Sequence, residues 1–203
     1  MSRPLWIAGT TLLAVVGASV ALAEDFVWPD GFHVAMTERF AEIDMDAFNE
    51  AEIYGLAEMR LGSIELVFGR TLLPDLAIKL GGTTRDIESG NDQLMQLCYV
   101  LENSSVLWLL SERYSHGRLD AISREFGPVQ DDWDCFVTDL SFVMDGLDLG
   151  ASIKDVYTLY GEDAHGDPEF IYYEDPQTPV ARAAVFSARN DRLVAFTMLE
   201  YVY

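Results

Sequence analysis

Three histidines, two cysteines and 34 acidic residues are the side chains of this 203-residue sequence whose types suit catalysis or metal binding. Two of the histidines, His116 and His165, each precede a glycine in a predicted turn, where a polar residue is ordinary. The sequence contains no G-x-S-x-G, no H-E-x-x-H and no phosphate-binding glycine loop. Because carboxylates are so numerous, chance alone brings some of them together. We therefore expect no catalytic residues, no cofactor and no enzymatic activity.

One short loop, residues 162–167, combines carboxylate oxygens with an imidazole. Its weak candidate ligands for an extracellular calcium ion are Asp163, His165 and Asp167. The loop lacks both the spacing and the final glutamate of an EF-hand. A solvated loop is the main interpretation, which leaves no metal site. A periplasmic protein that binds calcium or a small ligand through its acidic loops is the alternative function.

The two cysteines, Cys98 and Cys135, belong to no C-x-x-C motif and have no histidine close by in sequence. In an oxidising compartment two such cysteines more often pair than stay free. Closing the loop between them removes chain entropy from the unfolded state, worth on the order of 4 kcal/mol. We predict a structural disulfide.

The first 23 residues have the pattern of a secretory signal peptide. Arg3 is their one charge, residues 5–20 are largely apolar, and Ala21-Leu22-Ala23 supplies an A-x-A end. An uncleaved membrane anchor is the alternative, since the apolar run approaches the ~18 residues that a membrane span needs. We expect cleavage after Ala23 and a periplasmic or secreted protein that is not inserted in the membrane.

The formal net charge of −21 limits the classes of partner. Such a field repels nucleic acid and anionic lipid headgroups, and it favours a basic protein partner or simply a solvated surface. Half of the residues are hydrophobic and 12% are aromatic, which is enough for a packed core. The composition therefore predicts a globular domain that binds neither nucleic acid nor membrane surfaces.

The chain divides into four segments. Residues 1–23 are the signal peptide, residues 24–55 an amino-terminal helical or irregular segment, and residues 56–127 and 128–203 two copies of one unit. In each copy a short helix lies between glycines, Gly69 and Gly81 in the first and Gly150 and Gly161 in the second. The strand candidates that follow the two helices are residues 94–101, 106–110 and 119–124, then 169–173, 181–188 and 193–199.

Two further details link the copies. Arg118-Leu119-Asp120-Ala121 in the last strand of the first copy matches Arg192-Leu193-Val194-Ala195 in the second. The second helix also begins with an S-x-x-D capping box, Ser152 to Asp155. Each helix is about ten residues long and too short to persist alone. We predict an α+β fold of two tandem two-layer units, each a short helix packed on an antiparallel sheet of three to four strands.

A glycine, a short capped helix, a second glycine and three antiparallel strands resemble the repeat of secreted β-lactamase inhibitor proteins. The pattern is similar also to small lipoproteins of the outer-membrane assembly machinery, over residues 56–199. This chain departs from the lipoproteins because no cysteine follows its apolar run, and it has an extended segment before each helix. The resemblance implies a non-catalytic inhibitor, adaptor or envelope assembly factor that binds an unknown protein partner through a sheet face. It identifies no individual contact residue.

Aromatic residues of the predicted strands are the possible interface residues: Trp108, Tyr172, Phe186 and Phe196. Core packing explains most strand aromatics, but an open sheet face also favours them as anchors for a partner. The predicted strands are apolar on both faces, so something must cover the face opposite the helices. The candidates are a partner, the other repeat and the amino-terminal segment.

Overall fold

A computed structural model describes residues 58–89, 92–127, 134–144, 146–161, 165–167, 170–175 and 180–202. The predicted signal peptide and the amino-terminal segment, residues 24–55, lie outside the described residues. Within the described ranges, no helix is both long and apolar enough to cross a bilayer. The description that follows concerns the α+β body from residue 58 onward.

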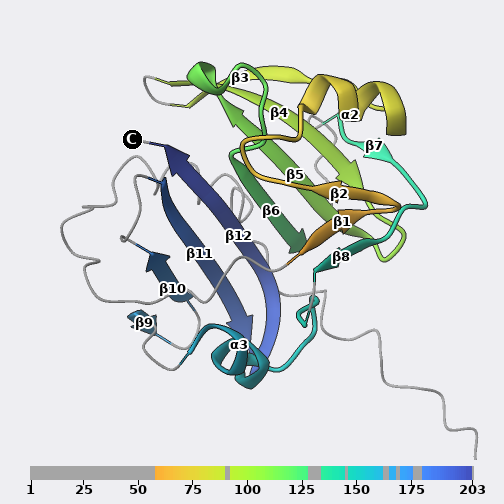
Figure 1. Cartoon of the computed structure of the whole chain (residues 1–203). Coiled ribbons are helices and arrows are strands. Elements are labelled where there is room, and N and C mark those ends of the chain that lie inside the picture. The colour runs from red at the N-terminus through yellow and green to blue at the C-terminus, as the bar shows by residue number, and fades with distance from the viewer. Residues whose placement is uncertain are drawn as a thin grey trace, which may run out of the picture.

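The body consists of one large sheet, one small sheet and two short α-helices (Figure 1). The helices are α2 (Leu73–Leu80) and α3 (Ile153–Tyr160), and a 3₁₀ turn, η2, spans Arg113–Ser115. The small sheet has the order β2 (Ile64–Leu66), β1 (Met59–Leu61), β8 (Phe142–Met144), and both pairings are antiparallel. The predicted α+β class is confirmed.

The large sheet is antiparallel along a path of eight strands. In spatial order these are β3 (Arg85–Ser89), β4 (Asp92–Val100), β5 (Ser105–Glu112), β6 (Ala121–Phe126), β12 (Arg192–Val202), β11 (Val180–Arg189), β10 (Phe170–Asp175) and β9 (His165–Asp167). A ninth strand, β7 (Phe136–Val137), pairs with β4 in parallel. Strands β6 and β12, the last strand after each helix, therefore meet at the centre.

Strand β3 lies in a segment that the predicted strands do not include. Residues 85–89 pair antiparallel with β4, with Ile87 opposite Leu94 and Asp86 opposite Met95. Strand β3 has one neighbour along the sheet path, and the side chains of Arg85 and Asp86 are exposed. Charged residues of this kind are usual on an edge strand, where they also suppress the hydrophobic alternation that marks a central strand.

The backbone before α2 is anchored to the strand hairpin that follows it. Gly69 donates its N–H to the Leu119 carbonyl at 2.8 Å, and Leu119 donates to Thr71 at 2.8 Å. The first helical residue, Leu73, donates to the Gly117 carbonyl at 2.9 Å. Gly69 has a φ of 68°, a conformation that glycine adopts without strain.

The backbone before α3 is anchored in the corresponding way. Gly150 donates to the Leu193 carbonyl at 2.7 Å, and Leu193 donates to Ala151 at 2.9 Å. The first helical residue, Ile153, donates to the Asp191 carbonyl at 3.0 Å. Gly150 has a φ of 86°. Both helices thus begin beside the turn that leads into β6 or β12.

The capping box predicted for α3 is confirmed. Ser152 Oγ accepts from the Lys154 N–H at 3.3 Å, and Asp155 Oδ2 accepts from the Ser152 N–H at 3.0 Å. Helix α2 has no side-chain cap and instead carries a proline, Pro74, in its first turn. Neither eight-residue helix is stable by itself, so each depends on the residues that it buries against the large sheet. These residues are Leu73, Leu76 and Ala77 in α2, and Ile153, Val156 and Tyr160 in α3.

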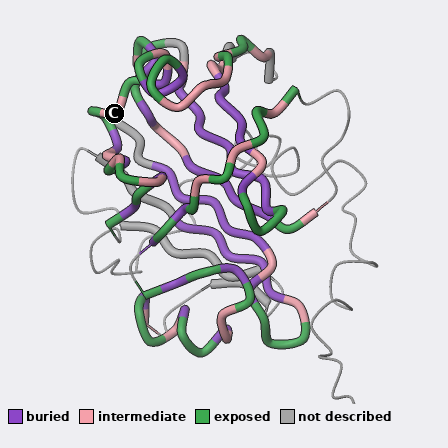
Figure 2. The backbone as a smooth tube through the Cα atoms, turned by 90° about the vertical axis from the view of Figure 1, so that its right-hand side faces the viewer, coloured by how far each residue is buried: buried purple, intermediate pink, exposed green. Residues whose placement is uncertain are grey.

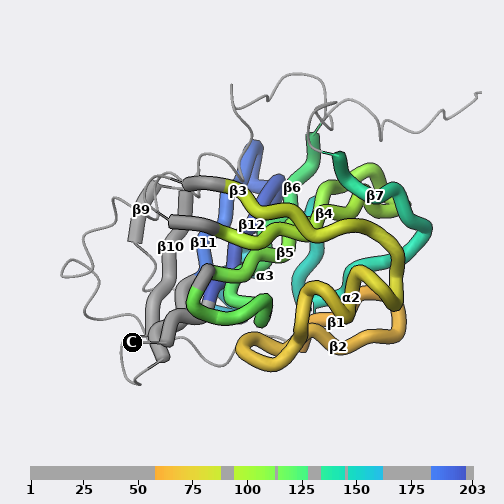
Figure 3. Tube along the Cα trace, turned by 90° about the horizontal axis from the view of Figure 1, so that it is seen from above, coloured from red at the N-terminus to blue at the C-terminus, as the bar shows by residue number. Residues whose placement is uncertain are grey.

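The main core lies between the large sheet and a layer made of α2, the small sheet and α3. Leu61 and Phe142 contribute from the small sheet, and Phe186 and Phe196 from the large one. The Phe142 and Phe196 rings lie 6.1 Å apart, and those of Tyr160 and Phe186 lie 5.0 Å apart. Figure 2 shows the buried residues running along the central strands, and Figure 3 shows α2, β1 and β2 on the same side of β4.

The opposite face of the central strands is buried as well. Trp108 in β5 and Leu199 in β12 are each 1% exposed, and Ser123 and Thr197 form a buried hydrogen bond across the β6–β12 pair at 2.9 Å. This agrees with the expectation that something covers the second face. At these described residues both faces of the sheet are covered, and binding through a sheet face stays a prediction.

The predicted disulfide between Cys98 and Cys135 is confirmed, with the two Cα atoms 4.7 Å apart. Cys98 lies in β4 opposite Trp108, and both cysteines pack with Trp108 and Val106. Directly after Cys135, β7 pairs with β4, and the Thr138 N–H donates to the Val100 carbonyl at 3.0 Å. The chain then continues to β8 in the layer on the other face. The disulfide therefore fixes the chain where it passes around the edge of the sheet.

Replacing both cysteines, Cys98→Ala with Cys135→Ala, should lower the free energy of unfolding by roughly 2–4 kcal/mol, because the unfolded chain regains the entropy of an open loop. Urea denaturation of the oxidised protein and the double variant measures this. Hydrogen exchange at the Thr138 amide should accelerate in the variant far more than exchange in β12. Unchanged stability and unchanged exchange at Thr138 would contradict the role given to the bond.

Candidate functional site

The predicted interface aromatics are not surface residues where their side chains are described. Phe186 and Phe196 are both fully buried in the main core, and Trp108 is buried on the opposite face. Tyr172 lies in β10 opposite Val185, and its side chain is outside the description. In this fold the three described aromatics pack on the two sides of the sheet, so they are not exposed as contact residues.

The metal candidates are placed only in part. His165 and Asp167 lie at the two ends of β9, and Asp163 is outside the described residues. Among the residues that the structure does describe, no three histidine, cysteine or acidic side chains come together to hold a metal ion. His116 follows directly after the η2 turn, and its φ of 54° is the left-handed conformation that ends the turn.

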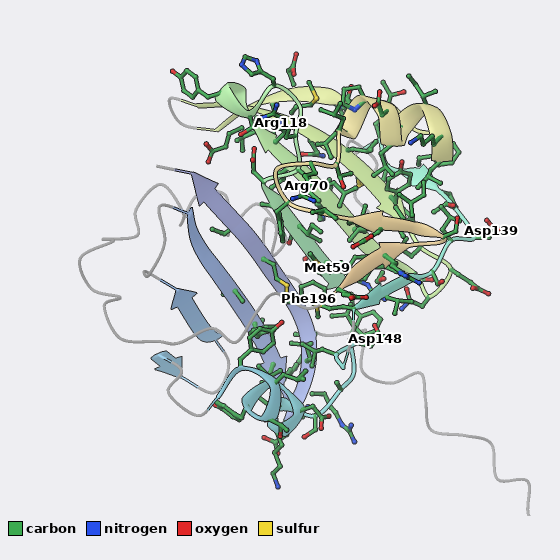
Figure 4. All side chains as sticks on the ribbon, viewed as in Figure 1. Met59, Arg70, Arg118, Asp139, Asp148 and Phe196 are labelled. Atoms are coloured by element: carbon green, nitrogen blue, oxygen red, sulfur yellow. A yellow bond between two sulfur atoms is a disulfide. The ribbon has the colours of Figure 1, made fainter. Side chains whose placement is uncertain are left out.

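Arg124 is one of two charged residues, with Glu125, that are buried among the described residues. Its Nε donates to Ser105 Oγ at 3.0 Å, and one terminal nitrogen donates to Asp148 Oδ1 at 2.6 Å. Its guanidinium carbon lies 5.3 Å from the centre of the Phe142 ring. Asp148 lies on the loop between β8 and α3 (Figure 4), so this cluster joins β6 to the segment that leads into the second helix.

The electrostatics of this cluster indicate a structural role. Burial lowers the pKa of Arg124, and the nearby Asp148 carboxylate opposes that effect. The Arg124 side chain is 3% exposed, whereas that of Asp148 is 66% exposed. Two of the five guanidinium N–H donors bind Ser105 and Asp148, and the burial of the side chain limits access of an external anion to the others. We therefore call this cluster the Arg124 clamp, because it holds β5 and β6 to the loop that leads into α3.

A second arrangement lies at the surface, where β7 meets the end of α2. We call it the β7 corner and define it by Gly81, Gly82, Tyr99, Phe136 and Val137. A Cβ atom on Gly81 would lie 2.7 Å from the Phe136 ring, and the Phe136 ring stands edge-on to that of Tyr99 at 6.3 Å. The Tyr99 hydroxyl donates to the Gly81 carbonyl at 2.8 Å. Glycine at position 81 is thus required by close approach as well as by its φ of 84°.

The β7 corner exposes large apolar side chains. Val137 is 74% exposed and Phe136 is 42% exposed, while Ile78 on the neighbouring helix α2 is 83% exposed. Asp134 and Asp139, two residues before Phe136 and two after Val137, are exposed acids. Figure 3 shows β7 beside β4, and Figure 4 labels Asp139 beyond the tip of the small sheet. A short apolar edge flanked by carboxylates is the kind of surface that can pair with another chain.

No protein-family model matches the sequence. No curated protein matches it either. Among solved structures, the chain is similar to the crystal structure of YjgB, a DUF4309-family protein from Bacillus subtilis, with a TM-score of 0.40 and 11% sequence identity. That match covers 67% of this chain and 82% of the other. Similarity at this level transfers no function or residue, so the site is assigned from its own geometry.

Sequence reasoning places an extended segment after Cys135 but misses the β7 corner as a site. The reason is that its parts come from three separate segments: the glycines that end α2, Tyr99 in β4 and the residues after the disulfide. The available signal is the disulfide itself. The disulfide places Phe136 and Val137 beside a stretch of the β4 edge that has no other described neighbour.

Two substitutions separate the contributions to the Arg124 clamp. Asp148→Asn keeps an acceptor oxygen but removes the charge that offsets a buried cation, and it should lower the free energy of unfolding by roughly 1–3 kcal/mol. Arg124→Met removes the buried charge together with its desolvation cost, and it should lower stability less. Chemical denaturation of both variants and of the double variant gives the coupling between the two residues.

Asp139→Asn is the matched control for that series, because it makes the same change at an exposed carboxylate. Its stability should stay within about 0.5 kcal/mol of the parent. A larger loss in Arg124→Met than in Asp148→Asn would show that the guanidinium stabilises the fold without needing its counter-charge.

Burial raises the pKa of Tyr99 to about 12. The folded protein therefore holds this proton more tightly than the unfolded chain, in which tyrosine has its ordinary pKa of about 10. The stability that results is fully present below pH 10 and is lost as the pH rises toward 12, at roughly 1.4 kcal/mol per pH unit. Urea denaturation of the parent and of Tyr99→Phe across this range should show a shallower decline in the variant. Parallel declines would contradict the assignment.

Proposed function

We propose that this chain is a non-catalytic protein-interaction module built from two copies of one α/β unit, residues 56–127 and 128–203. The observation that carries the interaction role is the β7 corner, where Phe136 and Val137 are exposed at a strand edge that no described strand pairs with. The strongly acidic composition points to a basic protein as its partner.

The paired backbone hydrogen bonds support the duplication. Gly69 and Gly150 each donate to a leucine of the matching R-L-x-A segments, Leu119 and Leu193, and each leucine donates back to the residues before its helix. Isolated bridges repeat the correspondence, since Leu72 pairs with Arg118 and Ser152 with Arg192. Each helix is followed by four strands, and the sheet order is the same outward from the β6–β12 pair in both directions. Equivalent bonds at equivalent positions are what a repeated unit produces.

An exported location fits this function. The disulfide between Cys98 and Cys135 is the kind of bond that persists in oxidising compartments, in line with a signal peptide cleaved after Ala23. A periplasmic or secreted inhibitor, adaptor or envelope assembly factor combines this location with a surface that offers binding and no catalytic group. The resemblance to β-lactamase inhibitor proteins is part of this proposal, because it rests on the same two-unit arrangement.

The test is affinity purification of the tagged chain from its own cells under oxidising conditions, followed by reconstitution with the purified partner. We expect one protein in stoichiometric amounts that re-forms the complex in size-exclusion chromatography. Recovery of the monomer alone at several salt concentrations would contradict the proposal.

A calcium titration in the same experiment addresses the ligand-binding alternative. A ligand that binds the native state alone must raise the melting temperature. The module should melt at the same temperature with and without calcium. A rise that Asp167→Asn abolishes would favour the calcium-binding function over the interaction module.

A further inference from the structure

The outer edge of β7 presents backbone groups that no described residue uses. The Thr138 N–H donates to the Val100 carbonyl of β4, which directs the backbone groups of Thr138 toward β4. Successive residues of a strand direct these groups to opposite sides, so the N–H and C=O of Val137 point away from the sheet. A strand edge of this kind is a template for pairing with another chain.

The side chains beside this edge suit such pairing. Val137 and Phe136 are exposed to 74% and 42%, and they lie on opposite faces of the strand because neighbouring side chains alternate. By contrast, the neighbouring edge strand β3 exposes the charged Arg85 and Asp86. Charges on an edge strand discourage pairing, so β7 is the more receptive part of this side of the sheet.

The negative charge around β7 determines which kind of chain can pair with its outer edge. Asp134 and Asp139 flank β7, and the whole chain has a net charge of −21. A second copy of this chain would bring the same carboxylates to the same place, and like charges at close range disfavour that pairing. A segment with basic side chains is attracted by the carboxylates that repel a second copy. If its apolar residues alternate with basic ones, they share one face of the added strand, where they can cover Val137.

We propose that the outer edge of β7 binds an extended segment of a partner protein, with alternating basic and apolar side chains, as an added strand. Main-chain hydrogen bonds to Val137 supply one part of the binding, and contacts with Phe136, Val137 and the flanking aspartates supply the specificity. The disulfide holds this edge in place, because Cys135 directly precedes Phe136 and is bonded to β4. This inference rests on the proposed interaction function and names the chemistry of the partner.

The direct test uses a short peptide of alternating lysine and valine, titrated into the isotope-labelled full chain and followed by NMR up to about 1 mM, the weak end of specific affinities. We expect saturable shifts at the Val137 amide and protection of that amide from exchange. A peptide of alternating glutamate and valine, and a lysine–valine peptide with a central proline, should bind at least about tenfold more weakly. No shift at Val137 with the lysine–valine peptide would overturn the proposal, as would equal binding of all three peptides.

A matched pair of variants separates the edge from general charge effects. Val137→Lys and Val143→Lys make the same substitution at exposed edge-strand valines, 74% and 48% exposed, in β7 and β8. Val137→Lys should weaken peptide binding by about tenfold or more, and Val143→Lys by less than about threefold. Unchanged melting temperatures of both variants show that they fold. Equal weakening by the two variants would overturn the assignment to β7.

The same variants distinguish failure of this inference from failure of the proposed function. If the parent and Val137→Lys both re-form the complex with the native partner at equal affinity, the interaction function stands and the β7 edge is wrong. If neither chain yields a complex, the interaction function itself fails. If the chain self-associates through the residues around Val137, the basic-partner inference is replaced by pairing between copies.

Discussion

The pairing of β6 with β12 is the constraint on which the rest of this fold depends. Five consecutive residue pairs, from Ala121 opposite Leu199 to Glu125 opposite Ala195, join the strands that follow α2 to those that follow α3. We call this pairing of β6 with β12 the seam. Arg124 lies beside Phe196 on one face of the seam, and Ser123 and Thr197 form their hydrogen bond on the other face. Without this seam, each half would be a small sheet with an additional open edge and a short helix to support.

Buried polar residues of β6 and β12 explain why these two strands pair in one register. Shifting β12 by one residue would turn Phe196 away from the main core and bring Thr197 into it. The Arg124 guanidinium adds a further condition, because it needs both Ser105 and Asp148 within hydrogen-bond distance. Asp148 belongs to the loop that leads into α3, so the register of the sheet and the position of the second helix are set together.

The sequence was informative about local structure and much less so about exposure. Glycine-bounded helices, the Ser152 capping box and the cysteine pair depend on nearby residues or on compartment, and all could be predicted. The strand aromatics could not be assigned to a surface, because Trp108 and Phe196 lie on opposite faces of a sheet that is buried on both. The β7 corner and the burial of Arg124 depend on partners far away in the chain, such as Gly81, 18 residues from Tyr99, and Asp148, 24 residues from Arg124.

The central position of β12 has a consequence for how the chain is made. Strand β12 is the last described strand in chain order, yet it lies between β6 and β11 in the middle of the sheet. During synthesis the residues up to β6 emerge first, and the edge of β6 stays uncovered until residues 192–202 follow. A chain cut short before that point leaves two central edges unpaired, which is the state most prone to aggregation and proteolysis. The central pairing of the sheet thus depends on residues 192–202.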